Sequence, residues 1–213
     1  MDSKKKPTAE SQAPQVVHAE FIAGATSVAG LPAPALAEFA FAGRSNVGKS
    51  SLLNALMQRR NLARSSRTPG CTRQLNVFDV RTRDGLDIHF VDLPGYGYAK
   101  ISKTDKALWG PMLDGYLRER PTLRGVAILA DVRRGLEEEE KELIKFLQAP
   151  RAVSSNKPVS IIVVATKIDK LSLSARKPAI AKMERESGES AIPFSAVTGD
   201  GCDLLWRAIR KSI

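Results

Sequence analysis

Residues 38–50 read EFAFAGRSNVGKS, an apolar run followed by a glycine-rich segment that fits the pattern GxxxxGK(S/T). The apolar run predicts a short buried strand over residues 38–43, and the spacing of KSSLLNALMQ predicts a helix over residues 49–58. Where a strand turns through glycines into a helix, backbone N–H groups and the helix N-terminus surround a phosphate group. We therefore expect a phosphate-binding loop at residues 43–50.

The side chains of this loop match the chemistry of a nucleoside triphosphate. Lys49 would bridge the β- and γ-phosphates, and the Ser50 hydroxyl would bind Mg²⁺. The predicted nucleotide contacts in and beside the loop are Gly43, Arg44, Ser45, Asn46, Val47, Gly48, Lys49, Ser50 and Ser51.

A second motif, DLPG at residues 92–95, directly follows the apolar run IHFV. The carboxylate of Asp92 can hold Mg²⁺ through a water molecule, and the Gly95 N–H is available to the γ-phosphate. The tetrapeptide alone is common, but its position after a phosphate loop makes it specific. Leu93 and Pro94 belong to the same predicted contact segment.

A third motif, TKID, follows the apolar run VSIIVVA and predicts a guanine site. The carboxylate of Asp169 can accept both the N1–H and the exocyclic N2–H of guanine, a pair of donors that adenine lacks. The stem of Lys167 can lie along the plane of the base. The usual form of the motif is NKxD, so Thr166 is a variant. The predicted contacts are Thr166, Lys167, Ile168 and Asp169.

Two further loops complete the predicted site. The tripeptide FSA follows the last expected strand, where the Ala196 N–H could meet the guanine O6. The segment TPGCT at residues 68–72 lies between the phosphate loop and DLPG, where a switch threonine completes the Mg²⁺ shell when γ-phosphate is present. Thr68 and Thr72 both qualify by residue type. The tripeptide consists of Phe194, Ser195 and Ala196.

The remaining pattern predicts an α/β fold. Apolar runs that alternate with helices are typical of a mostly parallel sheet with helices on both faces. We expect six strands, one of them antiparallel, in a single domain over residues 21–213 that follows a flexible polar tail at residues 1–20. Asp84-Gly85 predicts a hairpin turn. Besides 38–43, strands are expected at 76–83, 86–92, 125–132, 159–167 and 191–195, and helices at 106–120 (disturbed at Gly110-Pro111), 136–148, about 174–187 and 202–211.

Composition limits the class of protein. The 213 residues are 43% hydrophobic and 26% charged, which is typical of a globular domain. Cys71 and Cys202 form no disulfide framework, which favours a reducing compartment, and we expect a cytoplasmic protein. The uncharged stretches are too short or too interrupted to cross a bilayer, so no membrane partner is expected.

The net charge of +10 is unevenly placed, because residues 58–83 contain seven arginines against a single acidic residue, Asp79. Such a segment is either a solvated basic face or a surface that meets a polyanion, for which RNA is the natural choice. It has no aromatic signature for base stacking, so contact with backbone phosphates is expected.

The motifs together resemble the EngB family, a branch of the translation-factor-related P-loop GTPases, which have a Ras-like G domain. The resemblance rests on EFAFAGRSNVGKSSLLNAL, RTPGCTRQLNVF, DLPGYGYAK, DVRRG and TKIDKL, and it extends from about Phe21 to the C-terminus. It implies GTP or GDP with Mg²⁺ as ligands. It also implies a role in assembly of the large ribosomal subunit in bacteria, with a requirement for normal cell division and septation.

The family pattern TPGxTxxLN also selects Thr72 over Thr68 as the switch threonine. Cys71 stands where a basic residue is common and Arg73 where Gln is frequent, but neither departure removes a predicted ligand. The resemblance implicates Gly70, Cys71, Thr72, Arg73 and Gln74 in nucleotide contact.

Tyr96 stands where many hydrolytic switches carry a water-positioning Gln. We expect slow GTP hydrolysis that depends on Lys49, Thr72 and Gly95 for positioning and charge neutralisation. Asn46 resembles the asparagine of potassium-stimulated GTPases, so a K⁺ ion beside the phosphates is a further hypothesis. Two alternatives are a metabolic kinase and an RNA-binding protein whose nucleotide site serves only structural binding. A monomer is the default.

Overall fold

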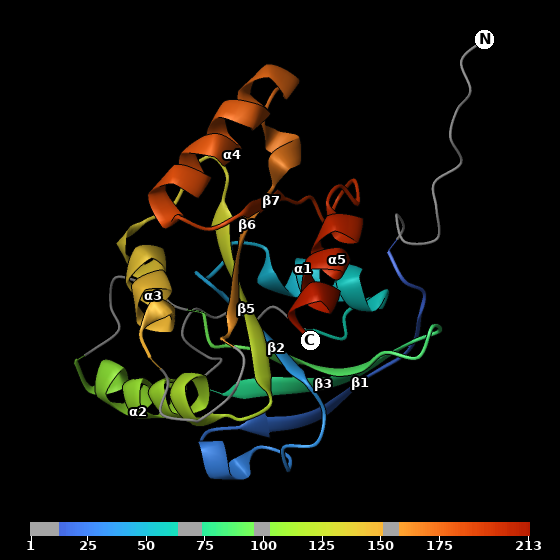
Figure 1. Ribbon diagram of the computed structural model, residues 1–213, viewed down its shortest axis with the longest axis vertical. Coiled ribbons are helices and arrows are strands. Elements are labelled where there is room, and N and C mark those ends of the chain that lie inside the picture. Colours follow the sequence, from blue (N-terminus) through green and yellow to red (C-terminus); the bar gives the residue numbers. More distant parts are fainter. Residues whose placement is uncertain (1–12, 64–73, 96–102, 151–157) are drawn as a thin grey trace.

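The apolar run at residues 38–43 forms strand β2 (Glu38–Gly43), and all six of its residues are buried. The computed structural model describes residues 13–63, 74–95, 103–150 and 158–213, without the side chains of residues 103–109. The other strands are β1 (Val16–Ala25), β3 (Leu75–Thr82), β4 (Asp87–Asp92), β5 (Leu123–Asp131), β6 (Ser160–Thr166) and β7 (Ala191–Pro193). They form one sheet in the order β1-β3-β4-β2-β5-β6-β7, which places β2 at its centre (Figure 1).

Strand direction follows from the connections. β3 and β4 form the hairpin expected at Asp84-Gly85, and Gly85 has a φ of +88°, which glycine adopts without strain. β3 is antiparallel to both of its neighbours, β1 and β4, while every other neighbouring pair in the sheet is parallel. The predicted mostly parallel sheet with one antiparallel strand is therefore confirmed, with seven strands instead of six.

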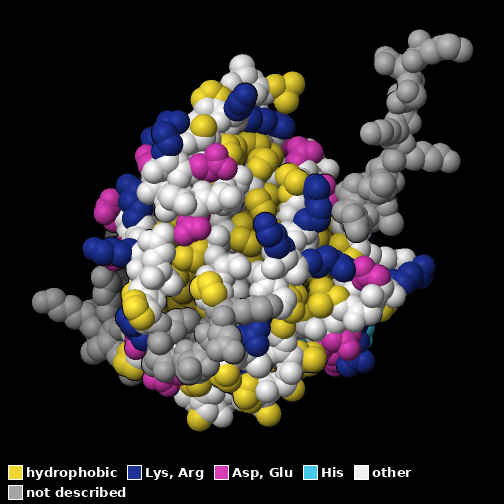
Figure 2. Space-filling model, in the orientation of Figure 1, with side chains coloured by type: hydrophobic (Ala, Val, Ile, Leu, Met, Phe, Trp, Pro, Cys, Tyr) yellow, Lys and Arg dark blue, Asp and Glu magenta, His cyan; other side chains and the backbone are white. Residues whose placement is uncertain are grey.

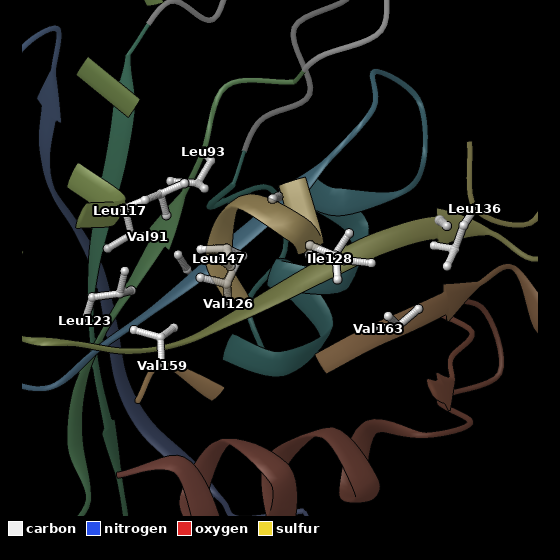
Figure 3. Packing of buried hydrophobic residues seen from close by; sticks show 14 of the residues in the cluster. Val91, Leu93, Leu117, Leu123, Val126, Ile128, Leu136, Leu147, Val159 and Val163 are labelled. Atoms are coloured by element: carbon white, nitrogen blue, oxygen red, sulfur yellow. The ribbon is translucent and has the colours of Figure 1, made fainter. Parts of the chain in front are cut away.

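Helices cover both faces of the sheet, as predicted (Figure 1). Apolar side chains of α2, α3 and α4 pack on one face, and those of α1 and α5 pack on the other. In Figure 3, Leu117 of α2 and Leu147 of α3 lie among Val91 and Val126 of the sheet. The helices are α1 (Lys49–Met57), α2 (Lys103–Glu119), α3 (Glu138–Gln148), α4 (Leu173–Ser187) and α5 (Cys202–Ser212), with 3₁₀ turns η2 (Val28–Gly30) and η3 (Ile168–Lys170).

The expected boundary of the N-terminal tail at residue 20 is wrong, because residues 16–20 belong to β1. The side-chain amide of Gln58, just after α1, fixes the start of this strand. It accepts from the Val16 N–H at 3.1 Å and donates to the Pro14 carbonyl at 2.9 Å. β1 then pairs with β3, which supplies partners for backbone groups that would otherwise be left at a sheet edge. Residues 1–12 lie outside the described residues.

A buried ion pair joins the start of β2 to the end of α2. Glu38 and Arg120 are only 1% and 6% exposed. Arg120 donates to Glu38 Oε1 through Nε at 2.8 Å and through Nη2 at 2.6 Å. Tyr116 and Thr122 donate to the same carboxylate at 3.0 and 2.9 Å. These bonds fix the C-terminal end of α2 on the sheet.

We predict that Arg120→Met lowers the free energy of unfolding by about 3–5 kcal/mol, since the buried Glu38 carboxylate would lose its cation. Arg124→Met is the matched control, because Arg124 is half-buried and donates to the Pro121 carbonyl at 2.7 Å rather than to an acid. It should cost less than about 1 kcal/mol. Urea unfolding measures both, and equal losses would contradict this account of the pair.

Candidate functional site

Five strands, β2, β4, β5, β6 and β7, point the same way and end at one edge of the sheet. The phosphate loop follows β2, DLPG begins at the last residue of β4, TKID at the last residue of β6, and FSA follows β7. In register, Phe41 faces Asp92, and Asp131 faces Thr166. The topology therefore brings together four motifs that are far apart in the sequence, at the edge where open α/β sheets bind their ligands.

The phosphate loop has a backbone that only certain residues allow. A Cβ on Gly43 would lie 2.9 Å from Val47 Cγ1 and 3.0 Å from Leu129 Cβ, so no side chain fits there. Gly48, directly before α1, has a φ of +105°, and Asn46 has a φ of +64°. Glycine and asparagine tolerate the left-handed region best. The predicted strand and helix are confirmed, and a glycine-containing loop joins them.

Lys49 and Asp92 form an ion pair at the centre of the site. Their side chains are 11% and 6% exposed, so a cation and an anion are both held in a nearly buried position. The Leu93 N–H donates to the Phe41 carbonyl at 3.0 Å, which continues the pairing of β4 with β2 beyond the last strand residue. Gly95 lies against the phosphate loop, because a Cβ there would be 3.2 Å from Ser45 Oγ.

TKID is joined to the phosphate loop by two side chains. The Thr166 hydroxyl lies 2.8 Å from the Val47 carbonyl oxygen and 3.1 Å from that of Ala130. Lys167 has a φ of +61°, and its ammonium donates to the Asn46 carbonyl at 2.8 Å. Threonine in place of the usual asparagine therefore still bonds to the phosphate loop.

The carboxylate of Asp169 is oriented by the FSA loop. The Ser195 hydroxyl donates to Asp169 Oδ1 at 2.7 Å, and this bond, with a smaller contribution from Lys170, holds the pKa of the carboxyl below its ordinary value. Ser195 is itself buried, and its Oγ accepts from the N–H groups of Val197 and Thr198, both at 3.2 Å. A fixed, ionised acceptor is what recognition of two neighbouring N–H donors requires.

Some predicted contact residues face the core instead of the edge. As whole residues, Val47, Leu93, Ile168 and Phe194 are at most 5% exposed, so their side chains are not available to a ligand. Gln74 is described, and its amide donates to Asn76 Oδ1 at 3.0 Å. The other residues predicted in the first switch loop, and Tyr96 after DLPG, lie outside the described residues. These are Thr68, Gly70, Cys71, Thr72, Arg73 and Tyr96.

The loop between β5 and α3 was not among the predicted contacts, yet it meets two of the motifs. Arg44 of the phosphate loop pairs with Glu137, which caps α3, and lies 3.5 Å from Glu139. Asp131 lies 3.1 Å from the Lys167 ammonium. A pocket of about 400 Å³ is lined by residues of this loop and of the phosphate loop. The only sequence signal was DVRRG itself, directly after a buried strand.

Comparison with known proteins decides the family. Residues 38–167 match the family model described as 50S ribosome-binding GTPase. The chain is 45% identical over 200 residues to the probable GTP-binding protein EngB of Anaeromyxobacter dehalogenans, which covers 90% of this chain and 89% of that protein. It is 40% identical over 203 residues to the protein of the same name from Exiguobacterium sibiricum, with 93% and 100% covered. This chain belongs to the EngB family.

A solved structure extends the comparison beyond EngB proteins. Era in complex with MgGDPNP and nucleotides 1506–1542 of 16S ribosomal RNA is 28% identical, with a TM-score of 0.64 over 83% of this chain and 56% of that one. This chain thus has the expected P-loop GTPase fold, and the EngB relatives that it matches are described as probable GTP-binding proteins. Within the described ranges, no helix combines the length and the apolar content that a bilayer span needs.

We predict that Thr166→Val weakens GDP binding about 5- to 30-fold, because the hydroxyl that lies 2.8 Å from the Val47 carbonyl oxygen is lost, and with it a bond between TKID and the phosphate loop. Thr166→Ser keeps the hydroxyl and should bind GDP within about threefold of the unsubstituted protein. Titration with a fluorescent GDP analogue measures both. A serine variant as weak as the valine variant would show that the hydroxyl is not the cause.

Proposed function

We propose that this chain is a guanine-nucleotide switch with slow GTP hydrolysis, which acts in assembly of the large ribosomal subunit and is needed for normal cell division and septation. The observation that carries the nucleotide part is the convergence at one sheet edge of the Lys49–Asp92 pair, the Lys167–Asn46 bond and the Asp169–Ser195 bond. The ribosomal part is supported by membership of the EngB family.

Guanine is the base that this edge favours. Ser195 keeps the Asp169 carboxylate oriented and ionised, and that carboxylate would accept the N1–H and N2–H of guanine. The Ala196 N–H would donate to O6. A kinase acting on adenine nucleotides would gain nothing from an ionised acceptor here, so the geometry argues against that alternative.

The residues near the phosphate loop fit a bound Mg²⁺, because the ion prefers hydroxyl, carboxylate and phosphate oxygens. Ser50, Asp92 through a water molecule, and Thr72 would hold it, and the ion when bound neutralises charge on the phosphates. Lys49, nearly buried beside Asp92, supplies a fixed positive charge for the β- and γ-phosphates. Gly95, which packs against Ser45, would offer its N–H to the γ-phosphate.

Hydrolysis should be slow without help, because Tyr96 lacks the carboxamide that orients water in many GTPases. Asn46 is the residue through which help would come. Its backbone has a φ of +64°, and its carbonyl accepts a hydrogen bond from Lys167. We propose that its side-chain amide binds K⁺ beside the phosphates. Such a cation supplies the positive charge that other systems take from an arginine.

The proposed partner is the large ribosomal subunit or its precursor, met through ribosomal RNA phosphates. The Era structure bound to 16S ribosomal RNA nucleotides supports an RNA partner by analogy. The topology places Arg81 and Arg83 at the hairpin end of β3, away from the edge that carries the phosphate loop. Figure 2 shows basic and acidic side chains interspersed over the visible face, so contact would be distributed. We propose a cytoplasmic monomer.

The alternative is an RNA-binding protein whose nucleotide site serves only structural binding. It is disfavoured because the nucleotide motifs are chemically intact, with Lys49, Asp92 and Asp169 all of the residue types that guanine-nucleotide binding and hydrolysis use. Association with ribosomal precursors that is unaffected by nucleotide, and by Lys49→Ala, would favour it.

We predict that GTP hydrolysis is at least about tenfold faster in K⁺ than in Na⁺ at equal ionic strength. Asn46→Gly tolerates the φ of +64° while removing the side chain, so it should lose this difference. Phosphate release is measured in both salts, with and without purified large-subunit precursors. Equal rates under all four conditions would refute the proposed dependence on a cation or a partner.

A further inference from the structure

Asp131 ends β5 next to β6, and no motif assigned it a role. We propose that Asp131 is a positioning residue for the guanine nucleotide, whose carboxylate holds the Lys167 side chain in place against the phosphate loop. This inference rests on the proposed guanine site and deepens it, because it names what fixes the lysine of TKID.

The contacts form a chain across three segments. Lys167 Nζ lies 3.1 Å from Asp131 Oδ2 and donates to the Asn46 carbonyl at 2.8 Å. The ammonium therefore has one partner on β5 and one in the phosphate loop. Among the described residues of β5, only Asp131 forms an ion pair with TKID.

Arg133 also binds the carboxylate of Asp131. Its Nε donates to Oδ1 at 2.9 Å, its Nη2 to Oδ2 at 2.6 Å and its backbone N–H to Oδ1 at 3.1 Å. These bonds, together with Lys167, hold the pKa of Asp131 far below its ordinary range. The side chain of Asp131 is 9% exposed, against 50% for Arg133. The carboxylate therefore stays ionised and in one orientation at neutral pH.

A lysine needs such support because its side chain is long and flexible. Lys167 is 32% exposed, and with a single carbonyl partner its stem would sample several rotamers. The Asp131 carboxylate and the Asn46 carbonyl hold the Lys167 side chain in one rotamer before the nucleotide binds. Less conformational entropy is therefore lost on binding. The stem is then ready to lie along the base while Asp169 reads its edge.

The test is dissociation of a fluorescent GDP analogue from Asp131→Asn, the full chain being used throughout. Asparagine keeps an acceptor for the Arg133 N–H, so the turn after β5 remains supported, but it lacks the charge that attracts Lys167. We expect a Kd for GDP raised about tenfold, mainly through faster dissociation, as for loss of one bond to a charged group. If the asparagine variant does not fold, Asp131→Ser takes its place. Serine also keeps an acceptor and lacks the charge, so we expect the same rise in Kd.

Two further variants separate positioning from general support of the loop. Arg134→Ala removes the neighbouring cation, which pairs with Glu137 at 3.6 Å instead of with Asp131, and should leave the Kd within about twofold. In a double-mutant cycle, Asp131→Asn should add little to Lys167→Ala, because the carboxylate acts through that lysine. An arginine variant as weak as Asp131→Asn, or additive losses in the cycle, would overturn the proposal.

Failure of the inference can be told from failure of the guanine site. If the unsubstituted chain does not bind GDP, the site and the inference are both wrong. If it binds GDP and Asp131→Asn binds equally well, only the role of Asp131 is wrong.

Discussion

Five strands that run the same way end at one edge of the sheet, and every contact that we ascribe to the nucleotide depends on this common edge. The edge gathers motifs that lie more than a hundred residues apart, such as Asn46 and Lys167. The phosphate loop is tightly packed at this edge, because even a Cβ on Gly43 would collide with Val47 and Leu129. The sheet order thus creates the site, and the residues at the strand ends give it its chemistry.

The site is more than a set of separate contacts, because its loops are bonded to each other. Thr166 and Lys167 tie the guanine motif to the phosphate loop, and Arg44 ties that loop to Glu137 at the start of α3. A nucleotide that moved the phosphate loop would therefore act directly on TKID. At the other end of the sheet, the buried Glu38–Arg120 pair fixes the end of α2, so that movement in response to nucleotide would be confined to the opposite edge.

The strands, the helices around them and the position of most motifs could be predicted from the sequence. Each motif directly follows an apolar run, and its residue types are those that nucleotide binding requires. The limits have physical causes. β1 was placed partly in the tail because its strand character depends on pairing with β3 and on Gln58, both distant in the sequence. Asp131 was overlooked because its contact with Lys167 exists only once β5 lies beside β6. Position in the motifs predicts Ile168 and Phe194 as nucleotide contacts, but both residues are only 1% exposed, because their side chains pack in the core.

The central claim is that this edge recognises guanine and not adenine. The most direct measurement is calorimetric titration of the unsubstituted chain with GDP and with ADP, in the same Mg²⁺ buffer. Because the two bases differ in the donors that Asp169 would accept, our account predicts that GDP binds at least about a thousandfold more tightly. Equal affinities for the two nucleotides would contradict it.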